Sequence, residues 1–292
     1  MGLTGRPGNA GVRESDQLRI AVAQIDPKIG DTAANLRTHL RLLEEVAEAG
    51  ARLVVFPECS LTGYCFEALD EALAEVDKVA DLPGGPLAET CRRLDIWCAV
   101  GLLEREGARL YNSALLLSPE GIVARYRKTH LPLLGVDRFT TPGPGPLTVV
   151  ETPFGRVSML ICYDLRFPEP SRVVALQGAE VILHLTNLPT RSLSFSEVLL
   201  PARAIENLVY VVSANRVGIE RGTAFLGRSK VIDPLGTRIA EASGDREEVL
   251  YAQIAPAIAR DKHVVSVPGR DEMDLFKDRR PELYGSIAER TG

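Results

Sequence analysis

The chain has 292 residues, of which 45% are hydrophobic and 25% charged, and its formal net charge is −5. This composition is typical of a globular protein with a sizeable core, and it gives no reason to expect nucleic acid or an anionic membrane as a partner. No apolar run reaches the roughly 20 residues that a transmembrane helix needs, so the sequence predicts no membrane span.

The two ends of the chain differ from its middle. Residues 1–17 lack the apolar segment of a secretory signal and predict a disordered leader. No linker divides the next stretch, so we expect a single domain over residues 18–267. Residues 268–292 are strongly charged but also contain apolar side chains, namely Leu275, Phe276, Leu283 and Tyr284. This mixture predicts a C-terminal arm that packs on the domain or on a partner subunit.

The chain contains five cysteines, an odd number. Without an export signal, this count favours reduced thiols over a disulfide framework, and we expect a cytoplasmic protein.

Short apolar runs rich in β-branched residues recur along the chain. Each is bounded by Gly, Pro, Asp or Asn, as strands are. The runs are Leu18–Ala23, Arg52–Phe56, Ile96–Leu103, Ser113–Leu117, Val157–Ile161, Val181–Leu185 and Leu208–Ser213.

Amphipathic stretches between these runs predict helices. The first is capped by Asp31 and ended by Gly50, and its inward face is predicted to be Leu36, Leu40, Leu43 and Ala47. A second covers Phe195–Asn207, with a predicted inward face of Val198, Leu199, Ala202 and Ile205. Pro201 should kink this second helix or mark a later start.

Two antiparallel hairpins interrupt the alternation of strands and helices. Leu110–Leu117 and Ile122–Arg127 flank one turn, and Thr223–Ile232 and Thr237–Ala242 flank another around Asp233–Gly236. Hairpins among alternating helices and strands predict a layered mixed α/β domain, not a purely parallel doubly wound sheet.

Glu58 and Lys128 are two places where chemistry could lie. Glu58 directly follows a buried strand, where catalytic groups are often found, although a solvated loop residue is the commoner outcome there. Lys128 ends a hairpin strand and, if buried, could lower a thiol pKa or stabilise an oxyanion. The alternative for Lys128 is a surface basic pair with Arg127.

Cys162 is the third place. An apolar strand brings it to a polar turn, and a helix is predicted to follow from about Pro168. This strand–turn–helix arrangement can expose a nucleophile and supply backbone N–H groups to an oxyanion. A small buried hydrophobe is an equally common role for a cysteine.

Other kinds of site have weaker support. The four histidines show no metal-binding spacing; they are His39, His130, His184 and His263. A Cys–His pair that uses His130 or His184 remains open, but the sequence lacks its local signature. The phosphate-binding glycine motifs are absent too, so metal and nucleotide sites are not expected.

Taken in order, the three places resemble the nitrilase superfamily of carbon–nitrogen hydrolases. The matching segments are Phe56-Pro57-Glu58, Arg127-Lys128 with His130-Leu131, and Ile161-Cys162-Tyr163-Asp164 with Arg166-Phe167-Pro168-Glu169. The resemblance runs from about Leu18 to Tyr284 and includes Arg203–Asn207 and Asp278–Tyr284. It implies an α-β-β-α sandwich that pairs with a second copy as a homodimer, and it implies no metal or organic cofactor.

The resemblance also implies roles for individual residues. Glu58 would be the general base, Cys162 the nucleophile, and Lys128 together with the Tyr163 N–H the oxyanion donors. Many members carry a second Glu between the Lys motif and a Pro-Gly turn, and here that stretch contains only Asp137. Asp137 is the candidate replacement, unless the second carboxylate is dispensable or comes from elsewhere.

The residues after Cys162 look like those of ω-amidases, which act on amides that bear a carboxylate. Arg166 could pair with that carboxylate, or with Glu169 instead. Asn187 and Tyr64 are expected to line the pocket. Against a close ω-amidase match, Phe195-Ser196-Glu197 stands where those enzymes tend to have His-Trp-Glu.

The leading hypothesis is therefore an amidase that releases ammonia from a small linear amide. An N-carbamoyl amine or amino-acid hydrolase and a nitrilase are the alternatives within the same chemistry. A catalytically silent interaction protein that keeps the fold is the alternative outside it, and the intact Glu58, Lys128 and Cys162 argue against it.

Overall fold

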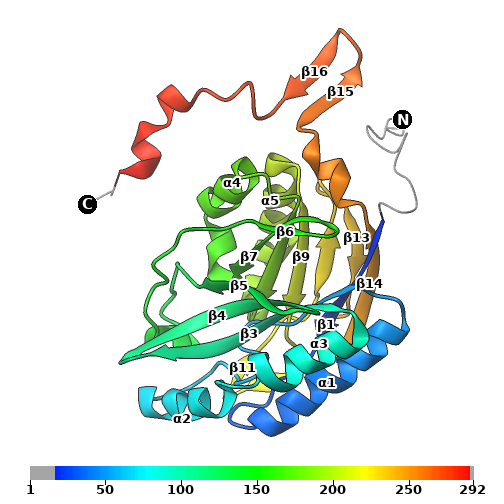
Figure 1. Cartoon of the computed structure of the whole chain (residues 1–292). Helices are drawn as coiled ribbons and strands as arrows, with labels where there is room; N and C mark the ends of the chain where they lie inside the picture. Colours follow the sequence, from blue (N-terminus) through cyan, green and yellow to red (C-terminus); the bar gives the residue numbers. More distant parts are fainter. Residues whose placement is uncertain (1–16, 290–292) are drawn as a thin grey trace.

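Two six-stranded sheets pack face to face and carry helices on their outer faces, as the computed structural model shows (Figure 1). The structure describes residues 17–289, so the predicted leader lies outside the described residues apart from Gln17. The α-β-β-α sandwich predicted from the sequence is confirmed.

The first sheet has the strand order β14-β1-β2-β3-β4-β5. Its strands are β1 (Leu18–Gln24), β2 (Leu53–Val55), β3 (Trp97–Glu106), β4 (Arg109–Ser118), β5 (Gly121–Arg127) and β14 (Glu248–Ile254). Its outer face packs on α1 (Thr32–Glu48) and α3 (Ala88–Leu94), while α2 (Leu69–Val79) lies beside β3.

The second sheet has the order β13-β12-β9-β8-β7-β6. Its strands are β6 (Val150–Thr152), β7 (Gly155–Ile161), β8 (Val181–Thr186), β9 (Tyr210–Asn215), β12 (Lys230–Ile232) and β13 (Arg238–Glu241). Its outer face packs on α4 (Pro168–Leu176) and α5 (Leu200–Asn207). Two small ribbons complete the chain: β10 (Ile219–Glu220) with β11 (Thr223–Ala224), and β15 (His263–Val267) with β16 (Asp271–Asp274).

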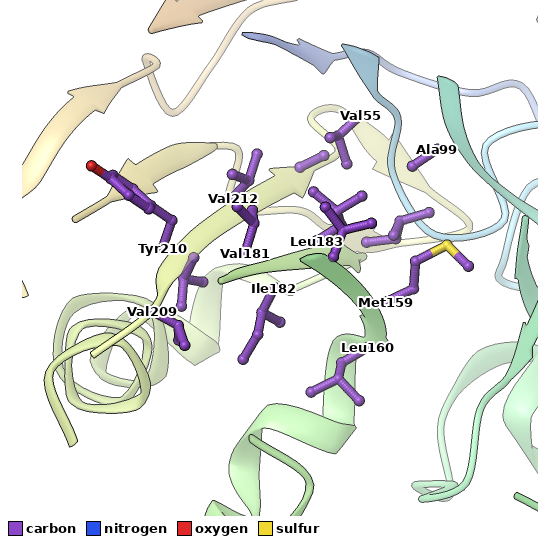
Figure 2. Close-up of a cluster of buried hydrophobic side chains, with 14 of the residues drawn as sticks. Val55, Ala99, Met159, Leu160, Val181, Ile182, Leu183, Val209, Tyr210 and Val212 are labelled. Carbon is purple, nitrogen blue, oxygen red and sulfur yellow. The ribbon is translucent and has the colours of Figure 1, made fainter. Parts of the chain in front are cut away.

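Successive side chains along a strand point to opposite faces of its sheet, and those on the two inner faces form the layer between the sheets. Figure 2 shows Met159 and Leu183 of the second sheet directed toward Val55 and Ala99 of the first. The neighbouring Ile182 points the other way, toward the helices. Each such buried apolar side chain stabilises the fold by about 1.5–3 kcal/mol relative to an exposed one.

Strand direction brings the predicted site residues to one edge. β2 runs parallel to β3, and the antiparallel pairs β3–β4 and β4–β5 return β5 to the same direction. Glu58 and Lys128 therefore both follow the carboxyl ends of strands in the first sheet. β7 and β8 are also parallel to each other, and Cys162 and Asn187 follow their carboxyl ends.

Over Phe195–Asn207 the structure confirms the later helix start that Pro201 indicated and corrects the predicted inward face. A wide π-type turn covers Phe195–Leu199, and the regular helix α5 starts only at Leu200, so that Pro201 lies in its first turn. Because of the wide turn, side chains in this segment point in other directions than they would on a single regular helix. Val198 and Ile205, predicted to point inward, are 61% and 48% exposed. The buried face is instead Phe195, Ser196, Leu200, Arg203, Ala204 and Asn207.

Two further predictions need smaller corrections. The strand predicted over Thr223–Ile232 is interrupted between Ala224 and Lys230, because Gly227 and Arg228 adopt positive φ angles of 60° and 53°. The first helix is capped by Asp31 as predicted, but its buried stripe is rotated. The residues buried on α1 are Thr32, Asn35, His39, Leu42, Leu43 and Val46.

The C-terminal segment leaves the sandwich as the β15–β16 ribbon, which spans the predicted domain boundary at residue 267 (Figure 1). Phe276 is its contact with the sandwich: the Lys262 ammonium lies 5.2 Å and the Arg172 guanidinium 5.4 Å from the centre of its ring. Farther along, Leu283 and Ile287 are 65% and 60% exposed.

Candidate active site

Glu58 is held in a fully buried loop just past β2. The loop packs directly on β3 at Gly101, where an added Cβ would lie 2.5 Å from the Pro57 carbonyl oxygen and 2.6 Å from the Cys59 nitrogen. Only a glycine allows this close approach. The Glu58 carboxylate is further oriented by the backbone N–H of Asn187, which donates to Oε2 at 2.9 Å.

Lys128 joins two carboxylates. Its Nζ donates to Glu58 Oε1 at 2.7 Å and to Asp137 Oδ2 at 2.6 Å, and the three side chains are fully buried. The structure thus brings Asp137 to the same ammonium as Glu58. Because two carboxylates share one ammonium, the trio carries an excess negative charge when all three groups are ionised.

Asn112 and Tyr64 complete this cluster. The Asn112 amide donates to Glu58 Oε1 at 2.7 Å and to Asp137 Oδ1 at 2.9 Å, and the Tyr64 hydroxyl donates to Asp137 Oδ2 at 2.8 Å. Tyr64 was predicted to line the pocket, whereas Asn112 was not predicted. The sequence did contain a signal for Asn112, because it is a lone amide side chain within the buried apolar strand β4.

Cys162 lies at a sharp turn between β7 and α4. Its φ angle is 44°, in the left-handed region that side chains rarely adopt, and a tight 3₁₀ turn follows over Cys162–Arg166. Such a conformation costs roughly 1–2 kcal/mol per residue and persists only where the surroundings hold it. The turn presents the thiol at the end of the strand and the N–H of Tyr163 next to it.

Asp164 holds this turn in place. Its Oδ2 accepts from the Tyr126 hydroxyl at 2.7 Å and from the Ile161 N–H at 2.9 Å, and its Oδ1 lies 2.8 Å from His130 Nδ1. His184 Nε2 contacts the carbonyl oxygen of Cys162 at 3.1 Å. Neither histidine is hydrogen bonded to the thiol, which speaks against the Cys–His pair left open by the sequence.

The electrostatics of the cluster suit acid–base chemistry. Burial raises the pKa of the Cys162 thiol to about 12, Glu58 adds to this rise, and Lys128 opposes it. Burial also raises the pKa of Glu58, against the opposing effect of Lys128. Burial by itself would lower the pKa of Lys128, but Asp137 and Glu58 outweigh it and raise that pKa well above its usual value. Lys128 therefore stays charged, while the thiol needs a base to lose its proton.

Arg166 and Tyr163 lie at the accessible side of the turn. Arg166 is exposed, and its guanidinium lies 4.9 Å from the centre of the Phe195 ring. No carboxylate of residues 17–289 forms an ion pair with Arg166, so the pairing with Glu169 considered from the sequence is not observed. Tyr163 is half-buried.

Across residues 17–289, no group of three or more His, Cys, Asp or Glu side chains is arranged to hold a metal ion. Within the same residues no helix is both long and apolar enough to cross a membrane.

Comparison with known proteins identifies the family. The sequence model of the carbon–nitrogen hydrolases matches residues 19–262. This chain belongs to that family. The carbon–nitrogen hydrolase is 36% identical over 271 residues to a Pyrococcus abyssi protein named nitrilase, with 91% of this chain and 99% of the relative covered. It is 34% identical to an (R)-stereoselective amidase of a Pseudomonas species, with 93% and 95% covered.

A solved structure with a similar fold is a mutant of the Nesterenkonia amidase from the nitrilase superfamily. It has a TM-score of 0.79 and 28% identity, with 91% of this chain and 95% of the amidase covered. Another structure of that amidase shows covalent addition of the acetamide moiety of fluoroacetamide at its active-site cysteine. The family predicted from the three motifs is confirmed, and the chain is a hydrolase of non-peptide carbon–nitrogen bonds.

Proposed function

We propose that this carbon–nitrogen hydrolase is an amidase that converts a small linear amide into a carboxylate and ammonia through a thioester on Cys162. The observation that carries the proposal is the buried Glu58–Lys128 pair, 2.7 Å between Oε1 and Nζ, whose charges act on the thiol at the β7–α4 turn. The family resemblance to proteins named amidase supports the same reaction class.

In the proposed first half-reaction, Glu58 takes the proton of Cys162 as the sulfur attacks the amide carbon. The thiol pKa of about 12 means that a thiolate is not present at rest, so proton transfer and attack are coupled. The amide oxygen becomes an oxyanion that Lys128 and the Tyr163 N–H stabilise. Protonated Glu58 then gives its proton to the amine nitrogen, the C–N bond breaks, and ammonia leaves.

In the second half-reaction, Glu58 takes a proton from a water molecule that attacks the thioester. The C–S bond breaks, the carboxylic acid departs, and the sulfur recovers its proton from Glu58. The raised pKa of Glu58 suits a group that must both accept and return a proton near neutral pH. No cofactor is required at any step.

Asp137 fills the role of the second carboxylate in this proposal. Because it is hydrogen bonded to Lys128 at 2.6 Å, the ammonium is not neutralised by Glu58 alone. Glu58 therefore retains more basicity than a carboxylate in an isolated ion pair would. Asn112 spaces the two carboxylates by donating to both.

Arg166 is proposed to select amides that carry a carboxylate. It is exposed, and among the described residues it has no carboxylate partner. Arg166→Gln should therefore raise KM for a carboxylate-bearing amide by about 10- to 100-fold, which is the effect expected from the loss of one charge-assisted hydrogen bond. KM for butyramide should stay unchanged. An equal change for both substrates would contradict the assignment.

The decisive experiment is ammonia release by the purified protein across ω-amides, aliphatic amides, N-carbamoyl amino acids and nitriles. Release from amides that is lost in Cys162→Ala, while the melting temperature is kept, is the expected result. Release confined to N-carbamoyl compounds, with carbon dioxide, or to nitriles would replace the amidase assignment. Full activity in Cys162→Ala would refute the proposed chemistry altogether.

We also propose that the protein is a cytoplasmic homodimer that buries the outer faces of α4 and α5. Val173, Leu176 and Ile205 on these helices are 39%, 44% and 48% exposed, and a second copy packed on α4 and α5 would cover these apolar side chains. The C-terminal arm is proposed to pack on the partner. Ile205→Lys should shift the mass measured by sedimentation from dimer to monomer, and a monomeric wild type would refute the dimer.

The five free thiols support the proposed location in a reducing compartment.

A further inference from the structure

We propose that Glu220, a residue of the short β10–β11 ribbon, positions the catalytic cluster by holding the loop that carries Tyr64. This inference rests on the proposed function, because it assigns Glu220 a part in that same site. Glu220 touches none of the reacting groups, and it acts through Tyr64 and Asp137.

The Glu220 carboxylate is buried and binds two consecutive backbone N–H groups. Its Oε2 accepts from the N–H of Tyr64 at 2.9 Å and from the N–H of Cys65 at 2.6 Å. The side chain is 3% exposed. Two N–H groups on one carboxylate oxygen fix the peptide between Tyr64 and Cys65, which lies 155 residues away in the sequence.

Arg216 anchors Glu220 from the other side. Its Nη1 donates to Glu220 Oε1 at 2.5 Å, and its Nη2 donates to Asp26 Oδ1 at 2.7 Å and to the Pro27 carbonyl oxygen at 3.0 Å. Arg216 is 1% exposed. Because the charged pair is buried and its partners are fixed by β1 and β9, the carboxylate has little freedom to follow the Tyr64 loop if that loop moves.

Tyr64 carries this restraint to the catalytic cluster. Its ring packs on the backbone of Gly135, where an added Cβ would lie 2.4 Å from a ring carbon. Its carbonyl oxygen accepts from the Val136 N–H at 2.8 Å, and its hydroxyl donates to Asp137 Oδ2 at 2.8 Å. The same Oδ2 accepts from Lys128, so the Tyr64 loop sets where Asp137 meets the ammonium.

Loss of this restraint should change how strongly Lys128 acts on Glu58. If Asp137 withdraws from Lys128, Glu58 becomes the main partner of the ammonium and a weaker base. The acidic limb of the kcat–pH profile, which reports the base, should then move to lower pH while kcat falls. Lys128 and Asp137 are the titratable groups that act on Glu58. Glu58 in turn raises the pKa values of Cys162, Cys59 and Tyr64.

The test is a double-mutant cycle between Glu220→Gln and Asp137→Asn. Glu220→Gln keeps an oxygen for the two N–H groups but loses the charge that binds Arg216. We expect it to lower kcat about 10-fold, to leave KM within about twofold, and to move the acidic limb to lower pH. In the Asp137→Asn background the same substitution should change kcat by less than about twofold, because its route to Glu58 is already gone.

Two controls separate a positioning role from a structural one. Glu71→Gln removes a half-buried carboxylate of the same region, which pairs with Arg221, and should leave kcat and the pH profile unchanged. If Glu220→Gln does not fold, Glu220→Asp, which keeps the charge but shortens the reach, takes its place in the cycle. Additive effects on kcat, or an unshifted acidic limb in a folded Glu220 variant, would overturn the inference.

The rate at which iodoacetamide alkylates Cys162 gives a second readout that needs no substrate. Its pH dependence should move in Glu220→Gln as it does in Asp137→Asn, and an unmoved profile in Glu220→Gln would overturn the positioning role. A wild type that releases no ammonia from any amide would instead refute the proposed function. The two failures are therefore distinguishable.

Discussion

Gly101→Ala offers a direct test of how closely the site depends on the packing of the Glu58 loop. The added methyl group would lie 2.5 Å from the Pro57 carbonyl oxygen, 2.6 Å from the Cys59 nitrogen and 2.7 Å from the Glu58 Cα. Since non-bonded heavy atoms approach to about 3.5–4.0 Å at their optimum, the Glu58 backbone must shift by roughly 1 Å.

A displacement of that size should lower kcat about 100-fold, because Glu58, the proposed general base, would no longer be correctly placed for the thiol and the substrate. The overpacked loop should also lower the free energy of unfolding by about 1–3 kcal/mol. The assay is Cys162-dependent ammonia release together with thermal unfolding. Gly84→Ala is the matched control, since its added methyl group meets no atom within 4 Å. Wild-type kcat in Gly101→Ala would refute the reasoning.

Three further predictions concern Lys128, two buried histidines and Tyr126. Lys128→Met should lower kcat about 10²- to 10³-fold, as loss of an oxyanion donor does, and unchanged turnover would remove Lys128 from the mechanism. His39 and His184 have pKa values lowered by burial to about 4, so the unfolded chain binds protons first as the pH falls below 6.5. The contribution of each histidine to the free energy of unfolding is constant above that pH and should decrease by about 3 kcal/mol between pH 6.5 and 4. His184→Gln should remove its share of this decrease in denaturant titrations. Tyr126→Phe should lower the free energy of unfolding by about 1–3 kcal/mol, because it removes a hydrogen-bond donor from the buried Asp164 carboxylate. Thermal unfolding measures this loss.

Much of the fold was predictable because strand periodicity and turn residues act locally. The Asp31 cap and the Gly50 terminus of α1 depend on neighbours within one helical turn, and both are observed. The stripe that α1 buries was harder to predict. Asn35 and His39 lie on it because each finds buried partners, the Leu61 carbonyl for Asn35 and the Ser60 hydroxyl for His39. An apolar pattern cannot anticipate such partners.

The site shows the same division. Glu58, Lys128 and Cys162 could be proposed from the sequence because each stands at the end of a recognisable strand within a known motif, and the structure places each of them there. Asn112 and Glu220 could not be proposed from the sequence because their hydrogen bonds reach partners 54 and 155 residues away. The phase of the Phe195–Leu199 turn was missed for a related reason, since the sequence does not reveal how a proline in the first turn of α5 is accommodated.

The sandwich also holds the proposed base and the proposed nucleophile on two separate sheets. The first sheet supplies Glu58 and Lys128, and the second supplies Cys162 and the Asn187 N–H that binds Glu58. Within the described residues, the apolar layer between the sheets joins the two sets, together with polar bridges such as the one from the Asn187 N–H to Glu58. The packing that stabilises the fold therefore also sets the distance over which the proton of Cys162 must travel, so stability and catalysis depend on the same layer.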